Sequence, residues 1–165
     1  MKAIRAQHYA KPSTTAELAA SIYLAFFFVV AALTQLFAFE SYPDVIRSYG
    51  LPMADELALP LAAALVCLEV FAIPYLLWMR VSRLMHLVSF ACGWLVLLYW
   101  LGIGVWQSIV DFHIANAGLF GAKLLLPQGW WLVSYMTVLI ILMALVSRSS
   151  RPVMRRSSIG KKQSS

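Results

Sequence analysis

The chain has 165 residues, of which 62% are hydrophobic and 12% are charged, against about 45–50% and about 25% in soluble domains. This composition excludes a water-soluble globular protein and predicts a single domain embedded in a membrane. The formal net charge is +6, but the basic residues form short blocks beside apolar runs, which indicates membrane topology and not nucleic-acid binding.

Four apolar runs follow one another along the chain, each near the roughly 20 residues that a helix needs to cross a bilayer. We place the predicted helices at Glu17 to Phe39, Leu57 to Met79, Leu84 to Trp106 and Trp130 to Val146. Lipid leaves no partner for exposed backbone groups, and the runs lack the alternation of a barrel, so the predicted fold class is all-α, an integral membrane four-helix bundle. Residues 17–146 form this domain, between the N-terminal segment 1–16 and a basic tail, 147–165, that is expected to be disordered.

The distribution of Lys and Arg predicts the orientation of the bundle. Eleven of the thirteen lie in the N-terminal segment, the second connection and the tail, whereas the first and third connections hold one each, Arg47 and Lys123. Positive residues accumulate on the cytoplasmic side of a membrane. We therefore expect a cell-membrane protein with both termini in the cytoplasm. The first connection, with breakers at Pro43 and Pro52, is expected to form an ordered outer cap around a short helical piece.

Glu69 is the ionisable residue in the middle of a predicted span, where a carboxyl costs about 2.5–3.5 kcal/mol. At about 1.5 Å per residue, Trp94 and Thr137 on the next two helices lie at its depth, and Tyr135 lies about one turn further out. Pro74 removes a backbone donor and predicts a kink beside Glu69. Two hypotheses stay open: a proton-relay or ligand-contact site in a distorted helix, or a neutral carboxyl that fixes helix packing through hydrogen bonds.

Small residues and cysteines on the middle helices have structural interpretations. Gly93, Gly102 and Gly104 mark places where another helix could approach the third helix closely. Cys67 and Cys92 lie in apolar runs without C-x-x-C spacing, and buried thiols usually behave as small hydrophobes. We therefore predict neither a disulfide scaffold nor a metal site.

Four sequence features combine into a family resemblance. The first helix carries Thr34 and Gln35 near its outer end, and the next connection reads F-E-S-Y-P-D-V-I-R-S-Y-G-L-P from Phe39. The second helix, A-L-V-C-L-E-V-F-A-I-P, carries Glu69, and N-A-G-L-F-G follows from Asn116. Together, over roughly residues 17–146, they resemble the MauE and DoxX-like family of small four-helix membrane proteins.

The resemblance also shows a departure from the family pattern. In the MauE-like branch the segment before the last helix commonly reads C-G-C-F-G, a thiol pair that fits disulfide or electron handling. The matching positions here are 117–121, where Ala117 and Leu119 replace both cysteines. We expect the turn to persist without thiol redox chemistry.

The resemblance implies an accessory membrane protein, since MauE is associated with maturation of methylamine dehydrogenase and DoxX with a quinone-linked sulfur oxidoreductase. The leading hypothesis is a non-enzymatic accessory or scaffold component that contacts lipid and, through its outer face, a protein partner. No cofactor is expected. Glu69 would fix helix packing or touch a ligand, and the outer mouth would be shaped by Asn116, Gly118, Phe120 and Gly121. Secondary candidates are Pro74, Trp94, Tyr135 and Thr137.

An alternative hypothesis is a quinone- or lipid-binding subunit of a membrane oxidoreductase system. The kinked second helix and the intramembrane Glu69 favour it, as do the aromatic residues of the third helix: Trp94, Tyr99, Trp100 and Trp106. The missing thiol pair argues against it. A small transporter ranks last, because the helices lack inward polar groups and an internal repeat.

Overall fold

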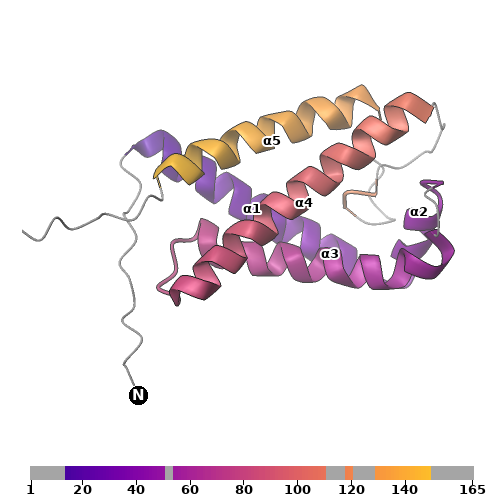
Figure 1. Ribbon diagram of the computed structural model, residues 1–165, viewed down its shortest axis with the longest axis horizontal. Coiled ribbons are helices and arrows are strands. Elements are labelled where there is room, and N and C mark those ends of the chain that lie inside the picture. The colour runs from indigo at the N-terminus through magenta and orange to yellow at the C-terminus, as the bar shows by residue number, and fades with distance from the viewer. Residues whose placement is uncertain (1–13, 51–53, 111–117, 121–128, 150–165) are drawn as a thin grey trace, which may run out of the picture.

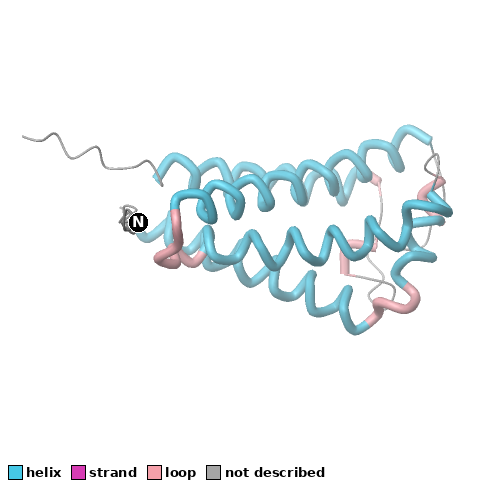
Figure 2. Tube along the Cα trace, turned by 60° about the horizontal axis from the view of Figure 1, so that its bottom comes forward, coloured by secondary structure: helices cyan, strands magenta, loops and turns pink. Residues whose placement is uncertain are grey.

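The computed structural model describes residues 14–50, 54–110, 118–120 and 129–149, and four long helices in these ranges run side by side (Figures 1 and 2). They are α1 (Thr15–Phe37), α3 (Ala54–Leu76), α4 (Arg83–Val110) and α5 (Trp130–Ser149); a short helix, α2 (Tyr42–Arg47), lies at one end. Each of the four is long and apolar enough to cross a membrane. The described ranges contain no strand, so the prediction of an all-α chain with four candidate spans is confirmed.

The observed helix bounds differ from the predicted ones by a few residues, for local reasons. Helix α1 begins at Thr15 because Thr14 and Glu17 form a capping box, in which each side chain accepts a hydrogen bond from the other residue's backbone N–H. Helix α3 ends at Leu76, shortly before Trp78 takes a positive φ of 48°. Helix α5 continues to Ser149, so residues 147–149, predicted as tail, are helical. The length of an apolar run alone does not predict at which residue a helix begins or ends.

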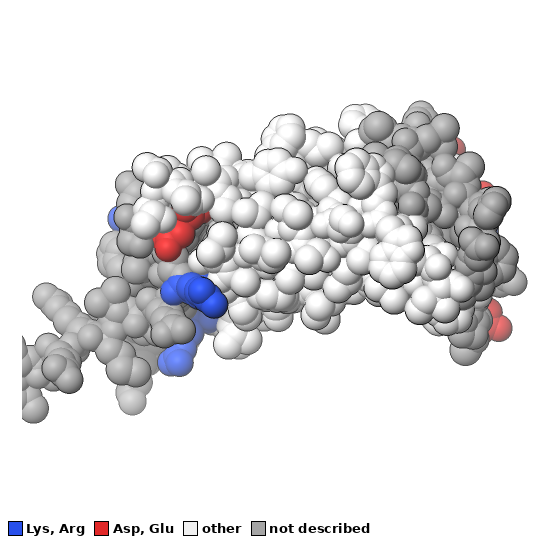
Figure 3. Space-filling model, turned by 90° about the horizontal axis from the view of Figure 1, so that it is seen from above, with Lys and Arg blue, Asp and Glu red and all other residues white. Residues whose placement is uncertain are grey.

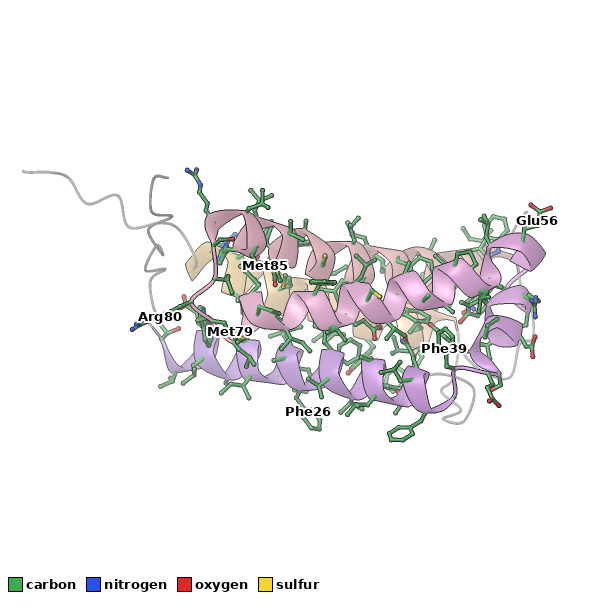
Figure 4. The ribbon with its side chains drawn as sticks, turned by 90° about the horizontal axis from the view of Figure 1, so that it is seen from below. Phe26, Phe39, Glu56, Met79, Arg80 and Met85 are labelled. Carbon is green, nitrogen blue, oxygen red and sulfur yellow. The ribbon has the colours of Figure 1, made fainter. Side chains whose placement is uncertain are left out.

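The two ends of the bundle differ in what they carry. The start of α1, the α3–α4 turn and the end of α5 lie together at one end, and α2 lies at the other (Figure 1). Arg80 marks the first end, which we call the Arg80 end, and Glu56 marks the second, the α2 end (Figure 4). Between them the described surface in this view is a broad belt without Lys, Arg, Asp or Glu (Figure 3). The belt is formed by the apolar spans, and Phe26, 65% exposed, points from it away from the bundle (Figure 4). The first and last described residues therefore lie on the same side of the belt.

Helix packing places α3 and α5 on opposite corners of the bundle. Helix α1 packs against α3 and α5, and α4 packs against the same two helices. A Cβ added at Gly93 would lie 2.9 Å from the Met143 side chain, and one at Gly104 would lie 3.2 Å from Val133, so α5 approaches α4 at both glycines. At Gly102 nothing lies within 4 Å. The predicted close approach is confirmed for Gly93 and Gly104 and is wrong for Gly102, which faces outward.

The backbone around Pro74 is tied to neighbouring helices. The Tyr75 N–H donates to the Ser89 hydroxyl of α4 at 2.9 Å, and that hydroxyl lies 3.3 Å from the Ala72 carbonyl, to which it donates. Ser21 of α1 donates to the Leu76 carbonyl. Proline removes one intrahelical hydrogen bond and crowds the preceding turn. Buried serines of α1 and α4 therefore bond the Tyr75 N–H and the Ala72 and Leu76 carbonyls at this end of α3.

Candidate functional site around Glu69

Glu69 of α3 is fully buried and is tied to α1 by a hydrogen bond. Its Oε1 accepts from the Nε2 of Gln35, which is also fully buried, at 3.0 Å. The same amide nitrogen donates to the Leu119 carbonyl at 3.0 Å. Gln35 thus joins two helices and the segment 118–120, which are far apart in the sequence.

The segment 118–120 lies inside the α2 end of the bundle (Figure 1). Leu119 is 1% exposed, and the Phe120 ring packs edge-on against Phe27 of α1, with 5.9 Å between ring centroids. Phe27 lies about 12 Å along α1 from Gln35, toward the middle of the bundle. Non-helical backbone at membrane depth must find its partners within the protein. Gln35 supplies that partner to the Leu119 carbonyl.

Gly118 fits beneath the end of α2 because it has no side chain. Its φ is +73°, and a Cβ there would lie 2.0 Å from the Tyr49 hydroxyl oxygen and 2.8 Å from the Val45 side chain. Any other residue would be strained in this backbone conformation and would also collide with α2 and its cap. Two further predicted residues, Asn116 and Gly121, lie outside the described residues.

Several polar side chains gather around the Gln35–Glu69 pair. The Trp100 indole of α4, fully buried, interacts with the Glu69 carboxyl, although the indole N–H does not reach hydrogen-bond geometry. Tyr42 of α2 interacts electrostatically with Glu69, Tyr49 and Tyr99. Five buried polar atoms of this cluster have no hydrogen-bond partner in the structure: Gln35 Oε1, Tyr42 Oη, Glu69 Oε2, Tyr99 Oη and Trp100 Nε1.

Burial also affects the two tyrosines at the α2 end. It raises the pKa of the Tyr42 hydroxyl well above its ordinary value, and nearby Tyr49, Glu69 and Tyr99 add to the shift. Burial likewise raises the pKa of Tyr49, with a further contribution from Tyr99. Both hydroxyls are therefore neutral in the neutral pH range. The cluster combines one carboxyl, one amide, hydroxyls and an indole. These groups can donate and accept hydrogen bonds, and none of them is a cation.

The expected partners of Glu69 were wrong. The Thr137 hydroxyl donates to the Val133 carbonyl of its own helix at 2.8 Å, and the Tyr135 hydroxyl pairs with Tyr23 at 3.1 Å. Trp94 packs edge-on against Phe90, and its indole N–H has no partner in the structure. Equal depth in a bundle does not fix rotation about each helix, and α5 lies diagonally across from α3. Pro74 lies between Ala72 and Tyr75, whose backbone groups bond Ser89, and it is five residues from Glu69.

Gln35 belongs to the motif of the first helix, but the sequence does not predict it as a site residue. The signal was an amide within an apolar run, which demands a buried partner just as Glu69 does. Pairing the two would have required the knowledge that α1, and not α5, packs beside α3.

A groove of about 440 Å³ lies between the segment 118–120 and α5. The described residues of its lining are mostly apolar and aromatic: Leu119, Phe120, Trp131, Leu132, Ser134, Tyr135 and Val138. The groove therefore shares Leu119 with the Gln35–Glu69 site. The aromatic residues that favour the alternative hypothesis are not among the described lining residues of this groove: Trp94, Tyr99, Trp100 and Trp106. Of these, Trp100 is fully buried in the core.

Within the described ranges, no group of three or more His, Cys, Asp or Glu side chains could hold a metal ion. Both cysteines are free thiols, Cys67 exposed on α3 and Cys92 buried on α4. Comparison of the chain with models of protein families, with curated proteins and with solved structures finds no match.

Proposed function

We propose that this chain is a MauE/DoxX-like accessory protein of the cell membrane, with both termini in the cytoplasm, that acts as a non-enzymatic scaffold. In this proposal the α2 end faces outward and contacts a partner protein. The Lys and Arg distribution supports the orientation, because the basic residues Arg80 and Arg83 lie at the end that also holds the start of α1 and the end of α5.

One observation carries the proposal: the separate motifs on which the resemblance rests meet at one place in the fold. Gln35 contacts Glu69 and the Leu119 carbonyl, and Gly118 lies against Tyr49 at the end of α2. Residues that a family pattern links across the sequence are thus in direct contact. These contacts join α1, α3, the segment 118–120 and the end of α2, and a scaffold surface requires that its elements be held together in this way.

Photocrosslinking in native membranes tests the proposal. A photoreactive amino acid replaces Asp44, whose side chain is 71% exposed on α2, and in a matched chain it replaces Arg80, an exposed charged residue at the opposite end. We expect a defined crosslinked protein from position 44 that is absent from position 80. The same crosslinked species from both positions, or none above background from position 44, would contradict the proposal.

Variants of the site add a second test of the scaffold function. Glu69→Gln alters the carboxyl that Gln35 contacts, and Phe120→Ala removes the ring that packs on Phe27. We expect each to reduce recovery of the crosslinked partner and to lower stability in detergent. If both variants leave partner recovery and stability unchanged, the site has no role in presenting the α2 end.

The second candidate function is a quinone-binding subunit of a membrane oxidoreductase system, and the aromatic groove beside Phe120 is the observation that favours it. It ranks below the scaffold function because the described lining residues of the groove carry no charge and both cysteines of the family pattern are replaced. Solvent extraction of the purified protein tests it. A stoichiometric quinone in the extract would favour the subunit, and its absence, with no change of tryptophan fluorescence on adding quinone, would exclude it.

A further inference from the structure

The position and lining of the groove between the segment 118–120 and α5 indicate what kind of molecule can occupy it. Its lining begins at Trp131, beside Trp130, and these side chains are 68% and 73% exposed. Exposed tryptophans at the end of a span are typical of the headgroup level of a bilayer. From Trp131 to Val138 the groove follows α5 for about 10 Å, roughly a third of a hydrocarbon core of about 30 Å.

The polar groups of the lining are already occupied. The Ser134 hydroxyl donates to the Trp130 carbonyl at 2.8 Å, and the Tyr135 hydroxyl pairs with that of Tyr23 at 3.1 Å. Among the residues that the structure describes, the lining contains no charged side chain. An occupant of the groove therefore gains contact with hydrocarbon and aromatic rings, and the described side chains around it offer no charge that would attract an ionised group.

The groove is continuous with the lipid-facing surface of the bundle. Val138 belongs to its lining and is 53% exposed, and Ile141, one turn further along α5, is 55% exposed. A chain of methylene groups can therefore enter sideways from the bilayer without crossing protein.

We propose that this groove binds one acyl chain of a membrane phospholipid, in the leaflet that meets the start of α5, with the headgroup held beside Trp130 and Trp131. The chain lies against Leu119 and Phe120 and keeps the segment 118–120 packed on α1, where Gln35 bonds the Leu119 carbonyl. The bound lipid thereby supports the Gln35–Glu69 site. This assignment does not depend on the scaffold function.

The test uses the full chain in liposomes of phosphatidylcholine, a fraction of which carries a diazirine on one acyl chain. After irradiation, mass spectrometry of peptides maps the labelled residues. We expect labelling to be enriched several-fold on Phe120 and on Trp131 to Val138 over equally lipid-exposed positions elsewhere, such as Ile22, 53% exposed on α1.

Two tryptophan substitutions on one helix separate the groove from the general lipid surface. Val138→Trp fills the groove, whereas Ile141→Trp adds the same side chain at a comparably exposed position outside the lining. Groove labelling is expected to fall several-fold in the first variant and to stay unchanged in the second. Ser134→Phe is a second groove-filling variant, and circular dichroism with size-exclusion chromatography shows which variants fold.

Three results would overturn the assignment. One is labelling spread evenly over the lipid-exposed positions of the wild-type chain. Another is equal groove labelling in the folded groove-filling variants and Ile141→Trp. The third is displacement of the label by an isoprenoid quinone, or by crosslinks between the α5 helices of two copies, but not by added unlabelled phosphatidylcholine.

Discussion

At the scale of single residues, the Gln35 amide nitrogen serves two buried acceptors, Glu69 Oε1 and the Leu119 carbonyl. A buried acceptor that loses its donor costs about 1–3 kcal/mol. Measured hydrogen bonds within membranes are often weaker, about 0.6 kcal/mol on average. The effect of a Gln35 substitution therefore depends on how far the two acceptors can find other donors.

Gln35→Leu is expected to lower the free energy of unfolding by about 1–3 kcal/mol, because it leaves both acceptors without their donor. Reversible unfolding in mixed detergent micelles measures the change. Thr34→Val is the matched control, since the Thr34 hydroxyl donates to carbonyls of its own helix turn; its expected effect is within about 0.5 kcal/mol. Equal effects of the two substitutions would show that the bridge contributes nothing.

Gly118→Ala is expected to displace the segment 118–120 or the end of α2. The added Cβ would lie 2.0 Å from the Tyr49 hydroxyl oxygen, at a φ of +73°. A loss of about 1–3 kcal/mol is expected, from strain of this kind. Gly102→Ala is the control, because nothing lies within 4 Å of its Cβ position inside α4, and it should stabilise the helix by about 0.5–1 kcal/mol. Thermal melting in detergent distinguishes the two, and a stabilising Gly118→Ala would contradict the described packing.

Removal of the Tyr42 hydroxyl tests whether the polar cluster is under-satisfied. This hydroxyl is buried without a partner, so Tyr42→Phe is expected to raise stability by up to about 1 kcal/mol. Burial raises the pKa of Tyr42, so ionisation of this hydroxyl leaves the stability of the wild type unchanged below the unfolded-state pKa of about 10 and lowers it as pH rises above that value. Tyr42→Phe should therefore lose less stability than the wild type between about pH 9 and about pH 11, on either side of that pKa. Unfolding experiments across this pH range measure the difference. Identical dependence on pH in both proteins would argue against a buried hydroxyl at position 42.

At the scale of the elements, α3 depends on α4 where Pro74 interrupts its hydrogen bonds. The Ser89 hydroxyl accepts from the Tyr75 N–H and donates to the Ala72 carbonyl. Side-chain hydroxyls commonly re-satisfy backbone groups freed by proline in spanning helices. The end of α3 is thus positioned by a contact between helices.

Ser89→Ala is expected to cost about 1–2 kcal/mol, because it removes both of these hydrogen bonds. Pro74→Ala should reduce that cost, because in a regular helix the Tyr75 N–H bonds a carbonyl of its own helix and needs no acceptor from α4. A double-mutant cycle measures the coupling between the two substitutions, expected at about 0.5–2 kcal/mol. Strict additivity would mean that Ser89 does not compensate for the proline.

The helices could be predicted from the sequence, whereas the contacts between them could not. Spans follow from apolar length, and the breakers around Tyr42 to Ser48 indicated the short helix α2. The Glu69 carboxyl pairs with Gln35 and not with Thr137, because the partner depends on which helices are neighbours and how each is rotated. The buried position of Leu119 and Phe120 likewise depends on contacts with α1 that leave no local pattern in the sequence.

At the scale of the whole molecule, the charged ends and the apolar belt determine how the bundle can sit in a bilayer. The four candidate spans bring the start of α1 and the end of α5 to the Arg80 end, opposite α2 (Figure 1). Any membrane orientation must therefore place the α1–α3 connection on one side and the α3–α4 turn on the other. Lys and Arg accumulation predicts that the α3–α4 turn is cytoplasmic.

Cysteine accessibility in intact cells tests this arrangement directly. In a chain carrying Cys67→Ala and Cys92→Ala, single cysteines are introduced as Ser48→Cys, at the exposed end of α2, and as Ser82→Cys, in the α3–α4 turn. A membrane-impermeant maleimide is expected to label position 48 in intact cells and position 82 only after permeabilisation. Labelling of both positions in intact cells, or extraction of the protein into buffer without detergent, would contradict a four-span membrane bundle, and labelling of position 82 alone would reverse its orientation.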